Sequence, residues 1–464
     1  MPRIAVAGPS SVVTDAAAAI GREGGSVVDV AIVGALTAMC TEPGVCGPGG
    51  GGYLTVDVDG GDPVVIDGYM SYPGLGFEGE PHTREVVMPY GGGVTTLVDA
   101  GSVAVPGAFA ALDLAWRMYG SVPWAVLMEA VVDAIEGGFP VSYPTHLYLN
   151  EGAAQIYDVD PVSRAALFED GRPKPLGSTI EFPGLTDTLR YVGEHGAAVL
   201  YRGDLGRAIV DDLSERGGVL TMADLATYEP IARRPIRTRL GEWRLDLNPE
   251  PAVGGVGVAR ALELAGAGGT GLAPALIKTF EERRDGALMS PSTVAVAAVG
   301  DDGAAVAASF SAGYGSGVVP AGTGMLMNNS LGELELVTAG EPGKRMLSNM
   351  APAVARHDNS VVAVGSPGAD RITTAIATTL TRIAAGDDLV SAIEYPRAHP
   401  EFGDFGVRLA IEPGADVDGT GAELRRFEDR HMFFGGVAGA ALLDGRLVAH
   451  ADSRRVGAVG YTTP

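Results

Sequence analysis

The sequence predicts an α+β fold in which antiparallel sheets stack on each other and helices cover them. Residues 293–299 are apolar and uncharged, and after a turn at 301–303 residues 305–311 return as a second strand. This pattern is typical of a β-hairpin whose first strand is buried. Helix-rich and strand-rich stretches alternate without the regular strand–helix–strand rhythm of a doubly wound sheet. No repeat of fixed period and no linker between domains is evident in the 464 residues.

The first elements expected along the chain are two helices. Ser11 or Thr14 can cap the first of them, and a glycine pair beginning at Gly24 ends it. A second, strongly apolar helix is predicted over residues 28–39. Residues 42–52 contain too many glycines for a regular element and are expected to form a loop.

The rest of the chain is expected to mix strands and helices. Periodicity predicts strands over residues 53–59, 64–67, 236–247, 361–364, 408–411, 436–443 and 447–451, and helices over 107–137 (divided near 120–123), 204–229 (two short ones), 258–264 and 373–383. Residues 265–274 read as a loop, and the charged residues 281–285 are predicted to lie on the surface.

Composition excludes several classes of function. With 33 Lys and Arg against 57 Asp and Glu, the net charge of −24 disfavours binding to nucleic acid. No apolar run reaches the roughly 18 residues that a membrane helix needs, and the first residues lack the pattern of a secretion signal. We therefore expect a cytoplasmic protein with no membrane partner. Cys40 and Cys46 are expected to be reduced, buried side chains, with a redox pair as the alternative.

Local motifs leave the chemistry open. The glycine-rich loop 47–52 lacks the Lys-Ser/Thr of a phosphate-binding loop and precedes a strand, so nucleotide binding is a minor alternative. The seven histidines form no metal motif, and no GxSxG elbow accompanies them. Ser292 and Thr293 open the buried strand after a loop. A hydroxyl there is either structural or a nucleophile, and local sequence alone does not decide between the two.

An ordered series of short segments along most of the chain narrows this choice. The segments lie at residues 24–29, 42–43, 47–53, 103–107, 137–142, 203–204, 216–225, 314–318, 322–329, 365–368, 395–397 and 452–461. Together they resemble the γ-glutamyltransferase family of N-terminal-nucleophile (Ntn) hydrolases. The resemblance implies the four-layer αββα sandwich of these enzymes. It also implies an inactive precursor that cuts itself between Ser292 and Thr293, giving a large segment, 1–292, and a small one, 293–464, which share one core.

The resemblance also implies the catalytic groups. Thr293 becomes the nucleophile, and its new α-amine, with a pKa near ~7.7–8.0, takes the hydroxyl proton. The backbone N–H groups of Gly368 and Ala369 occupy the positions of the oxyanion hole. An acyl-enzyme then passes a γ-glutamyl or related acyl group from an amide to water or to an amine. The implied partner is a small-molecule substrate, and neither a cofactor nor a metal is implied.

Two sets of positions depart from the family pattern. The family opens its small segment with Thr-Thr-His-x-Ser, whereas Val294, Ala295 and Ala297 replace the last three named residues here. Ser311 falls where the family has a threonine close to the nucleophile, so a supporting hydroxyl is retained.

The positions that bind the glutamyl group have changed further. Tyr69 falls where the family has the arginine that clamps the substrate carboxylate. Glu333 aligns with the aspartate that holds the substrate amine, and Ser348 and Asn349 align with a serine pair. Losing a bidentate, charge-assisted contact should weaken recognition of a free α-carboxylate.

Three readings of function therefore remain. The first is an amide hydrolase or acyltransferase acting on γ-glutamyl groups. The second is a homologue with another substrate, either a different amide or a C–C bond cleaved in a biosynthetic pathway. The third is an uncleaved, catalytically silent binding protein, which the loss of the Thr-His-x-Ser run favours. The balance of hydrolysis against transfer and the oligomeric state are open.

Overall fold

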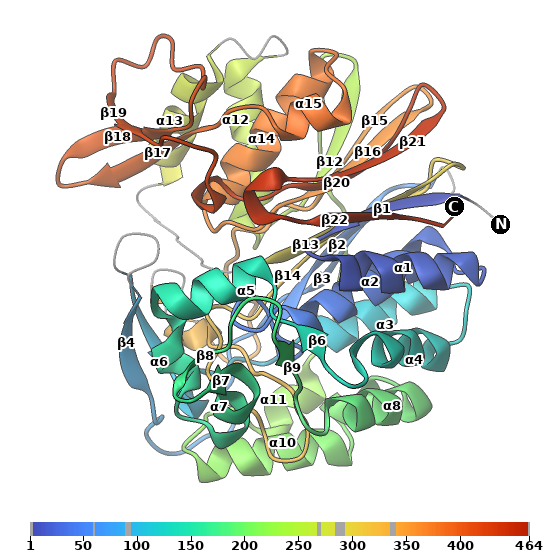
Figure 1. The fold of residues 1–464 in the computed structure, drawn as a ribbon, viewed down its shortest axis with the longest axis vertical. Coiled ribbons are helices and arrows are strands. Elements are labelled where there is room, and N and C mark those ends of the chain that lie inside the picture. The colour runs from blue at the N-terminus through green and yellow to red at the C-terminus, as the bar shows by residue number, and fades with distance from the viewer. Residues whose placement is uncertain are drawn as a thin grey trace.

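The computed structural model describes residues 3–58, 61–88, 94–266, 271–283, 293–334 and 340–462. Two β-sheets face each other, and helices cover the outer face of each (Figure 1). This confirms the αββα sandwich. Every strand pairing within the two sheets is antiparallel, as the sequence predicts.

The first sheet contains seven strands among the described residues. Their order is β10 (Ile231–Arg233), β3 (Val64–Gly68), β2 (Gly51–Asp57), β14 (Ala305–Ser311), β13 (Val294–Gly300), β1 (Ile4–Gly8) and β22 (Ala458–Tyr461). The predicted hairpin is therefore β13 and β14, at the centre of this sheet. This sheet therefore combines strands from before position 293 (β10, β3, β2 and β1) with strands from after it (β14, β13 and β22).

The second sheet has six strands in the described part of the chain. Their order is β11 (Ile236–Leu240), β12 (Trp243–Leu247), β15 (Ala353–His357), β16 (Ser360–Gly365), β20 (Ala438–Leu443) and β21 (Arg446–Ala451). We call the first sheet with its helices the first half of the molecule, and the second sheet with its helices the second half. A separate three-stranded sheet lies at the edge of the second half, with β17 (Ala398–Gly403), β18 (Gly406–Ile411) and β19 (Glu423–Arg426) (Figure 1).

Helices on the two outer faces complete the four layers. The first sheet is covered by α1 (Ser11–Arg22), α2 (Val27–Thr41) and α3 (Ala108–Tyr119); α4 (Trp124–Ile135) packs on α1 and α2, with α8 (Leu185–His195) outside α4. The second is covered by α12 (Val253–Ala265), α13 (Leu272–Arg283), α14 (Arg371–Ala384) and α15 (Leu389–Ile393). The short helices α5 (Tyr143–Tyr148), α10 (Asp204–Glu215) and α11 (Met222–Thr227) belong to the first half.

Alanines fill most of the space between the sheets. Strand β13 turns Ala295, Ala297 and Val299 toward the second sheet, while Val294 and Val296 pack under the helices. The facing strands contribute further small residues to this layer. Sheets normally pack about 10 Å apart, and short side chains permit close approach of the two backbones. The many alanines and glycines of the sequence are thus a packing requirement.

A capping box fixes the start of the buried helix α2. Ser26 accepts a hydrogen bond from the Asp29 backbone, and the Asp29 carboxylate accepts from Ser26 N at 2.8 Å. The same carboxylate accepts from the Ser121 hydroxyl at 2.6 Å, which ties the loop before α4 to α2. The segment 24–29, which carries part of the family resemblance, therefore stabilises the start of a helix and has a structural role.

Four local predictions were wrong. The predicted loop 265–274 overlaps α12, which ends at Ala265, and α13, which begins at Leu272. Residues 236–247 are two strands, β11 and β12, since Gly241 turns the chain with a φ of 59°. The N-cap of α1 is Ser10, one residue before the predicted Ser11, and β1 precedes it. Of the predicted surface segment 281–285, Glu281 and Glu282 are exposed, but Arg283 is half-buried at the end of α13.

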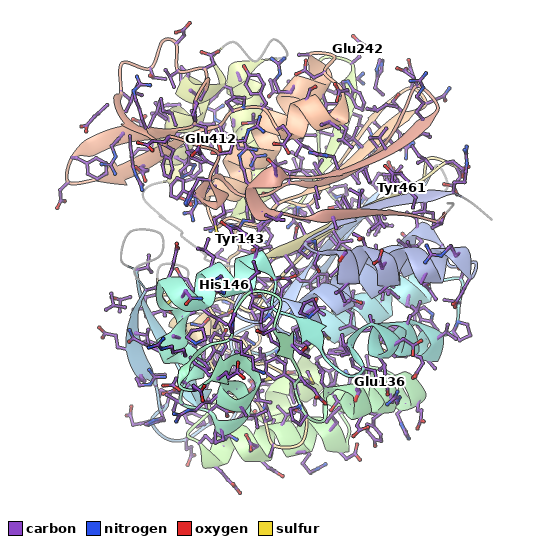
Figure 2. The ribbon with its side chains drawn as sticks, in the orientation of Figure 1. Glu136, Tyr143, His146, Glu242, Glu412 and Tyr461 are labelled. Carbon is purple, nitrogen blue, oxygen red and sulfur yellow. The ribbon has the colours of Figure 1, made fainter. Side chains whose placement is uncertain are left out.

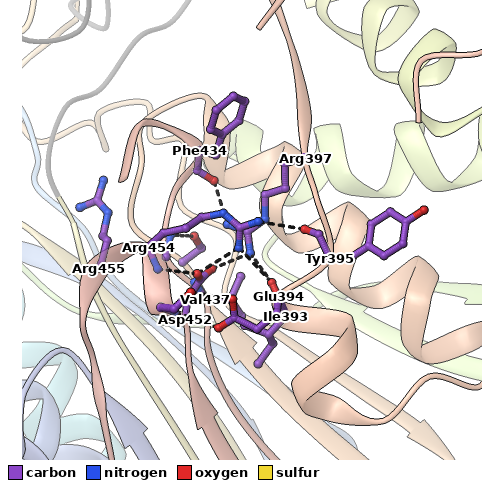
Figure 3. Close-up of polar contacts among 12 residues, drawn as sticks. Ile393, Glu394, Tyr395, Arg397, Phe434, Val437, Asp452, Arg454 and Arg455 are labelled. Carbon is purple, nitrogen blue, oxygen red and sulfur yellow. Dashed lines mark hydrogen bonds and ion pairs between the residues drawn. The ribbon is translucent and has the colours of Figure 1, made fainter. Parts of the chain in front are cut away.

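A buried ion network joins two C-terminal segments of the second half (Figure 3). The Arg397 guanidinium donates to Asp452 at 2.6 Å and to the carbonyls of Phe434 and Ile393, both at 2.9 Å. Arg454 bonds the other oxygen of Asp452 at 3.0 Å. The segments 395–397 and 452–461, noted for their family resemblance, thus hold the end of the chain in place. Among the described helices, none is long and apolar enough to cross a membrane.

Candidate active site

Thr293 lies at the entrance to strand β13, between the two sheets. Because Val294 pairs with Phe310, the next residues outward, Thr293 and Ser311, oppose each other across the strand pair. Alternation along β13 directs Thr293 to the same face as Ala295, toward the second sheet. The Thr293 residue is 2% exposed and Ser311 is fully buried. Ser292, and with it the bond predicted to be cut, lies outside the described residues.

The turn after β16 approaches this end of β13. A Cβ atom on Gly365 would lie 3.1 Å from the Ala295 Cβ and 3.2 Å from the Ser309 hydroxyl, so β16 packs closely against β13 and β14. The turn then continues through Pro367, which lines a small cavity together with Thr293. The predicted oxyanion residues Gly368 and Ala369 directly follow.

Gly368 and Ala369 have unusual backbone conformations. Their φ angles are 130° and 61°, although alanine in the left-handed region costs roughly 1–2 kcal/mol. Both residues are buried, and within the described part of the chain neither N–H donates a hydrogen bond. Buried N–H groups without an acceptor are rare in folded proteins. The turn after Pro367 thus carries two successive backbone N–H groups that have no acceptor within the described residues.

Three ionisable residues, Glu42, Asp452 and Arg455, also line the cavity shared by Thr293 and Pro367. Its volume is about 30 Å³. Pro144 of α5 is a further lining residue, and Figure 2 labels its neighbour Tyr143 at the boundary between the two halves. This space holds only about one or two water molecules.

Glu42 is a buried carboxyl group that sequence reasoning noted only as part of a motif. The Ser142 hydroxyl donates to it at 2.5 Å. Burial raises the pKa of Glu42 to about 7, against the opposing effect of hydrogen bonds from Ser142, Ser10 and Thr145. The group thus changes charge near neutral pH, next to the predicted nucleophile.

Three of the predicted substrate-binding residues, Tyr69, Glu333 and Ser348, lie close to one another. The Tyr69 ring stacks on Tyr53 with centroids 5.5 Å apart. Burial raises the pKa of Tyr69 well above its ordinary value; the Glu333 carboxylate adds to this, and a hydrogen bond with Ser348 opposes it. The structure therefore brings Tyr69, Glu333 and Ser348 together, and their role in substrate binding stays a prediction.

Asn349, the fourth of these residues, contacts a group that sequence reasoning missed. Arg283 Nη2 donates to Asn349 Oδ1 at 2.8 Å, and Nη1 donates to Thr373 Oγ1 at 3.3 Å. Thr373 lies in the first turn of α14, shortly after Ala369. The run Glu-Glu-Arg-Arg-Asp is typical of a solvent-exposed segment. Only these contacts with residues distant in the chain show that Arg283 is partly buried.

A wider cavity borders the same segments. It has a volume of about 790 Å³, and Ser71 and Leu347 line it, each one or two residues from a predicted substrate position. Arg345 also lines it, but Asp67, fully buried, accepts from its Nε at 3.3 Å. The volume lies in the range of small-molecule sites.

Other candidate chemistry receives no support in the described residues. No group of three or more His, Cys, Asp or Glu side chains could hold a metal ion in that part of the chain. Cys40 and Cys46 are buried free thiols, and burial raises the pKa of each. A Cβ on Gly50 would lie 2.2 Å from the Ser311 carbonyl oxygen. The glycine-rich loop is thus packed against β14 rather than shaped as a phosphate cradle.

Comparison with known proteins gives consistent results. A family model described as gamma-glutamyltranspeptidase matches residues 13–269 and 273–462. Glutathione hydrolase 5 proenzyme of Mus musculus is 26% identical over 86% of this chain and 81% of its own length. Glutathione hydrolase proenzyme of Escherichia coli K12 is 24% identical over 89% and 83%. Acylase ACY 1 proenzyme of Pseudomonas sp. strain V22 is 28% identical over 84% and 81%.

A solved structure shares the fold. The cephalosporin acylase from Bacillus halodurans superposes with a TM-score of 0.81 at 22% identity, covering 99% of this chain and 96% of that one. The likeness extends over both sheets and both helical layers.

Proposed function

Because the chain belongs to the gamma-glutamyltranspeptidase family, we propose that it is a self-cleaving amide hydrolase or acyltransferase with Thr293 as its nucleophile. Cleavage before Thr293 would free an α-amine with a pKa near ~7.7–8.0, which is partly neutral at cellular pH. This amine takes the proton of the threonine hydroxyl as it attacks an amide carbonyl. Cleavage thus creates the base, and the precursor lacks it.

The observation that carries this proposal is the pair of backbone N–H groups at Gly368 and Ala369 that donate to no described residue, in the turn after Pro367, which lines the cavity of Thr293. Attack on an amide places negative charge on the carbonyl oxygen. Preformed donors in a buried site stabilise that charge, and one such donor contributes ~2.7–4 kcal/mol in enzymes where it has been removed. The strain at Ala369 is consistent with a turn held for this purpose.

The acyl group of the substrate extends from Thr293 toward Tyr69, Glu333 and Ser348 in this proposal. Relatives named glutathione hydrolase and acylase suggest the substrate class, a γ-glutamyl or another acyl amide. Tyr69 offers a phenol and a ring face where a guanidinium is expected, so a γ-glutamyl group must find its cation elsewhere. The acyl-enzyme is resolved by water or by an amine.

Intact mass of the denatured protein, beside a Thr293→Ala control, tests the proposal. Fragments that meet between Ser292 and Thr293, absent from the control, would support the N-terminal threonine. Release of p-nitroaniline from acyl p-nitroanilides by the cleaved protein, and not by the control, would then support the amidase activity. A chain that stays whole during long incubation would instead favour the silent binding protein, which Val294, Ala295 and Ala297 make the second candidate.

A further inference from the structure

Arg283 is held at the junction of three helices in the second half of the molecule. It is the last residue of α13, which packs against α12, and α12 in turn packs against α14 on the outer face of the second sheet (Figure 1). Within the described residues its side chain donates hydrogen bonds to Asn349 and Thr373, both neutral side chains. The guanidinium also lies 5.1 Å from the centroid of the Phe280 ring.

No carboxylate among the described residues lies within ion-pair distance of Arg283. Asp370 is the nearest acidic influence on it, but Arg371 at 2.7 Å and His399 at 3.3 Å already pair with that carboxylate. Burial accordingly lowers the pKa of Arg283. A half-buried cation with neutral partners is costly, and an added anion would relieve that cost.

Two arginines near the predicted substrate residues differ in this respect. Arg345 and Arg233 both pair with the buried Asp67, at 3.3 and 2.8 Å. Their charge is therefore largely committed within the protein. An arginine carries five N–H donors, and the two bonds of Arg283 use two of them. No acceptor in the described part of the chain takes the other three donors.

The position of Arg283 connects the two sides of the predicted site. On one side, Asn349 follows Ser348, which hydrogen-bonds the Tyr69 phenol. On the other, Thr373 follows the Gly368–Ala369 turn by one helical turn. A Cβ on Gly257 of α12 would lie 3.1 Å from Arg283 Nη1, so a glycine there leaves room for the guanidinium.

We propose that Arg283 binds a carboxylate on the acyl group of the substrate, supplying from α13 the cation that Tyr69 does not provide. The ligand class is the monoamide of a dicarboxylic acid, such as a glutaryl or γ-glutamyl amide. This rests on the proposed function, since it assigns the far end of the same acyl group. The planar fork of arginine matches a carboxylate with two parallel hydrogen bonds.

The test compares three p-nitroanilides with one leaving group: γ-glutamyl, glutaryl and the uncharged valeryl. Each is assayed with the wild type, Arg283→Gln, Arg283→Lys and the control Arg260→Gln. Arg260 lies on α12 and pairs with the exposed Glu282 and Glu263. Its substitution by glutamine therefore removes the same charge from the neighbouring surface. Intact mass is recorded for every variant, and rates are divided by the cleaved fraction.

With Arg283→Gln, kcat/KM for the two acidic anilides should fall about 30-fold, as expected for a lost hydrogen-bonded charge. The valeryl anilide should change less than about 3-fold, since no carboxylate is present to lose a partner. Arg283→Lys should restore part of the preference, and Arg260→Gln none of these changes. Equal losses on all three anilides, or an unchanged preference for acidic ones, would overturn the proposal.

A binding measurement separates this proposal from the proposed function. Glutarate at millimolar concentration should raise the melting temperature of the wild type and of Thr293→Ala, but not of Arg283→Gln. If no anilide is turned over while glutarate still stabilises only the proteins with Arg283, the proposed function fails and the carboxylate site stands. If glutarate stabilises Arg283→Gln equally, the site is refuted whatever the activity.

Discussion

Replacing Glu42 by glutamine should make the protein more stable than the wild type as pH rises. The ordinary pKa of a glutamate is near 4.5, and burial raises that of Glu42 to about 7. Between these values the native state keeps a proton that the unfolded chain has lost. Stability of the wild type therefore falls by about 1.4 kcal/mol per pH unit in this window, and the fall ends once pH exceeds the native pKa.

The size of the stability change depends on how much of the pH range between the two pKa values can be reached in an experiment. The sequence pI of about 4.6 makes the protein poorly soluble in acid, so pH 5.5 is a practical lower limit. From pH 5.5 to 7 the shift amounts to about 2 kcal/mol. Glutamine keeps an oxygen to accept from Ser142 and cannot ionise. The difference between variant and wild type should thus grow by about 2 kcal/mol across this range and then level off.

Urea unfolding from pH 5.5 to 8 measures this difference. Both proteins carry Thr293→Ala, which keeps the chain in one piece and the unfolding unimolecular. Glu136→Gln is the matched control, because the Glu136 side chain is 59% exposed and lies on the surface of the first half (Figure 2). A difference for Glu42→Gln that stays constant within about 0.5 kcal/mol would refute the reasoning, since linkage requires a slope wherever the proton is retained.

Three further substitutions test the packing that holds the site. Asp452→Asn should cost about 3–5 kcal/mol in urea unfolding, because it leaves the fully buried Arg397 without its carboxylate; a loss below about 1 kcal/mol would contradict this. Ala369→Gly should raise the free energy of unfolding by about 1 kcal/mol, since the φ of 61° suits glycine, and a lower melting temperature would contradict it. Gly332→Ala should destabilise by about 1–3 kcal/mol or more, because its Cβ would lie 1.8 Å from the Leu97 carbonyl oxygen; unchanged unfolding would show that the loop yields.

The central elements of the fold could be predicted because their sequence patterns are long. Strands β13 and β14 are seven residues each, fully buried, and free of charge. Helix α2 is apolar on every side, since it lies between the first sheet and other helices. Strands β1 and β22 were not predicted. They have five and four residues, and so short a run carries little periodic signal.

The candidate site was only partly accessible from sequence. Thr293, Gly368 and Ala369 came from the ordered series of segments and stay predictions. Arg283 was assigned to the surface because its neighbours in the chain are charged, whereas its partners lie 66 and 90 residues away. Glu42 similarly depends on Ser142, 100 residues later. Burial of a charged residue by distant segments leaves no local pattern to read.

Both sheets contain strands from before and from after position 293, and this has a consequence for refolding. Strand β13 lies between β14 and β1, and only β1 comes from before the proposed cut. In the second sheet, β12 and β15 likewise join the two parts. If the chain is cut before Thr293, each part lacks strands that its sheets need. Denaturation would then separate two chains, recovery would depend on their concentration, and dilution would favour the separated state. The uncut precursor would refold as a single chain, independently of its concentration. The peptide bond before Thr293 would thus assist folding before it is cleaved.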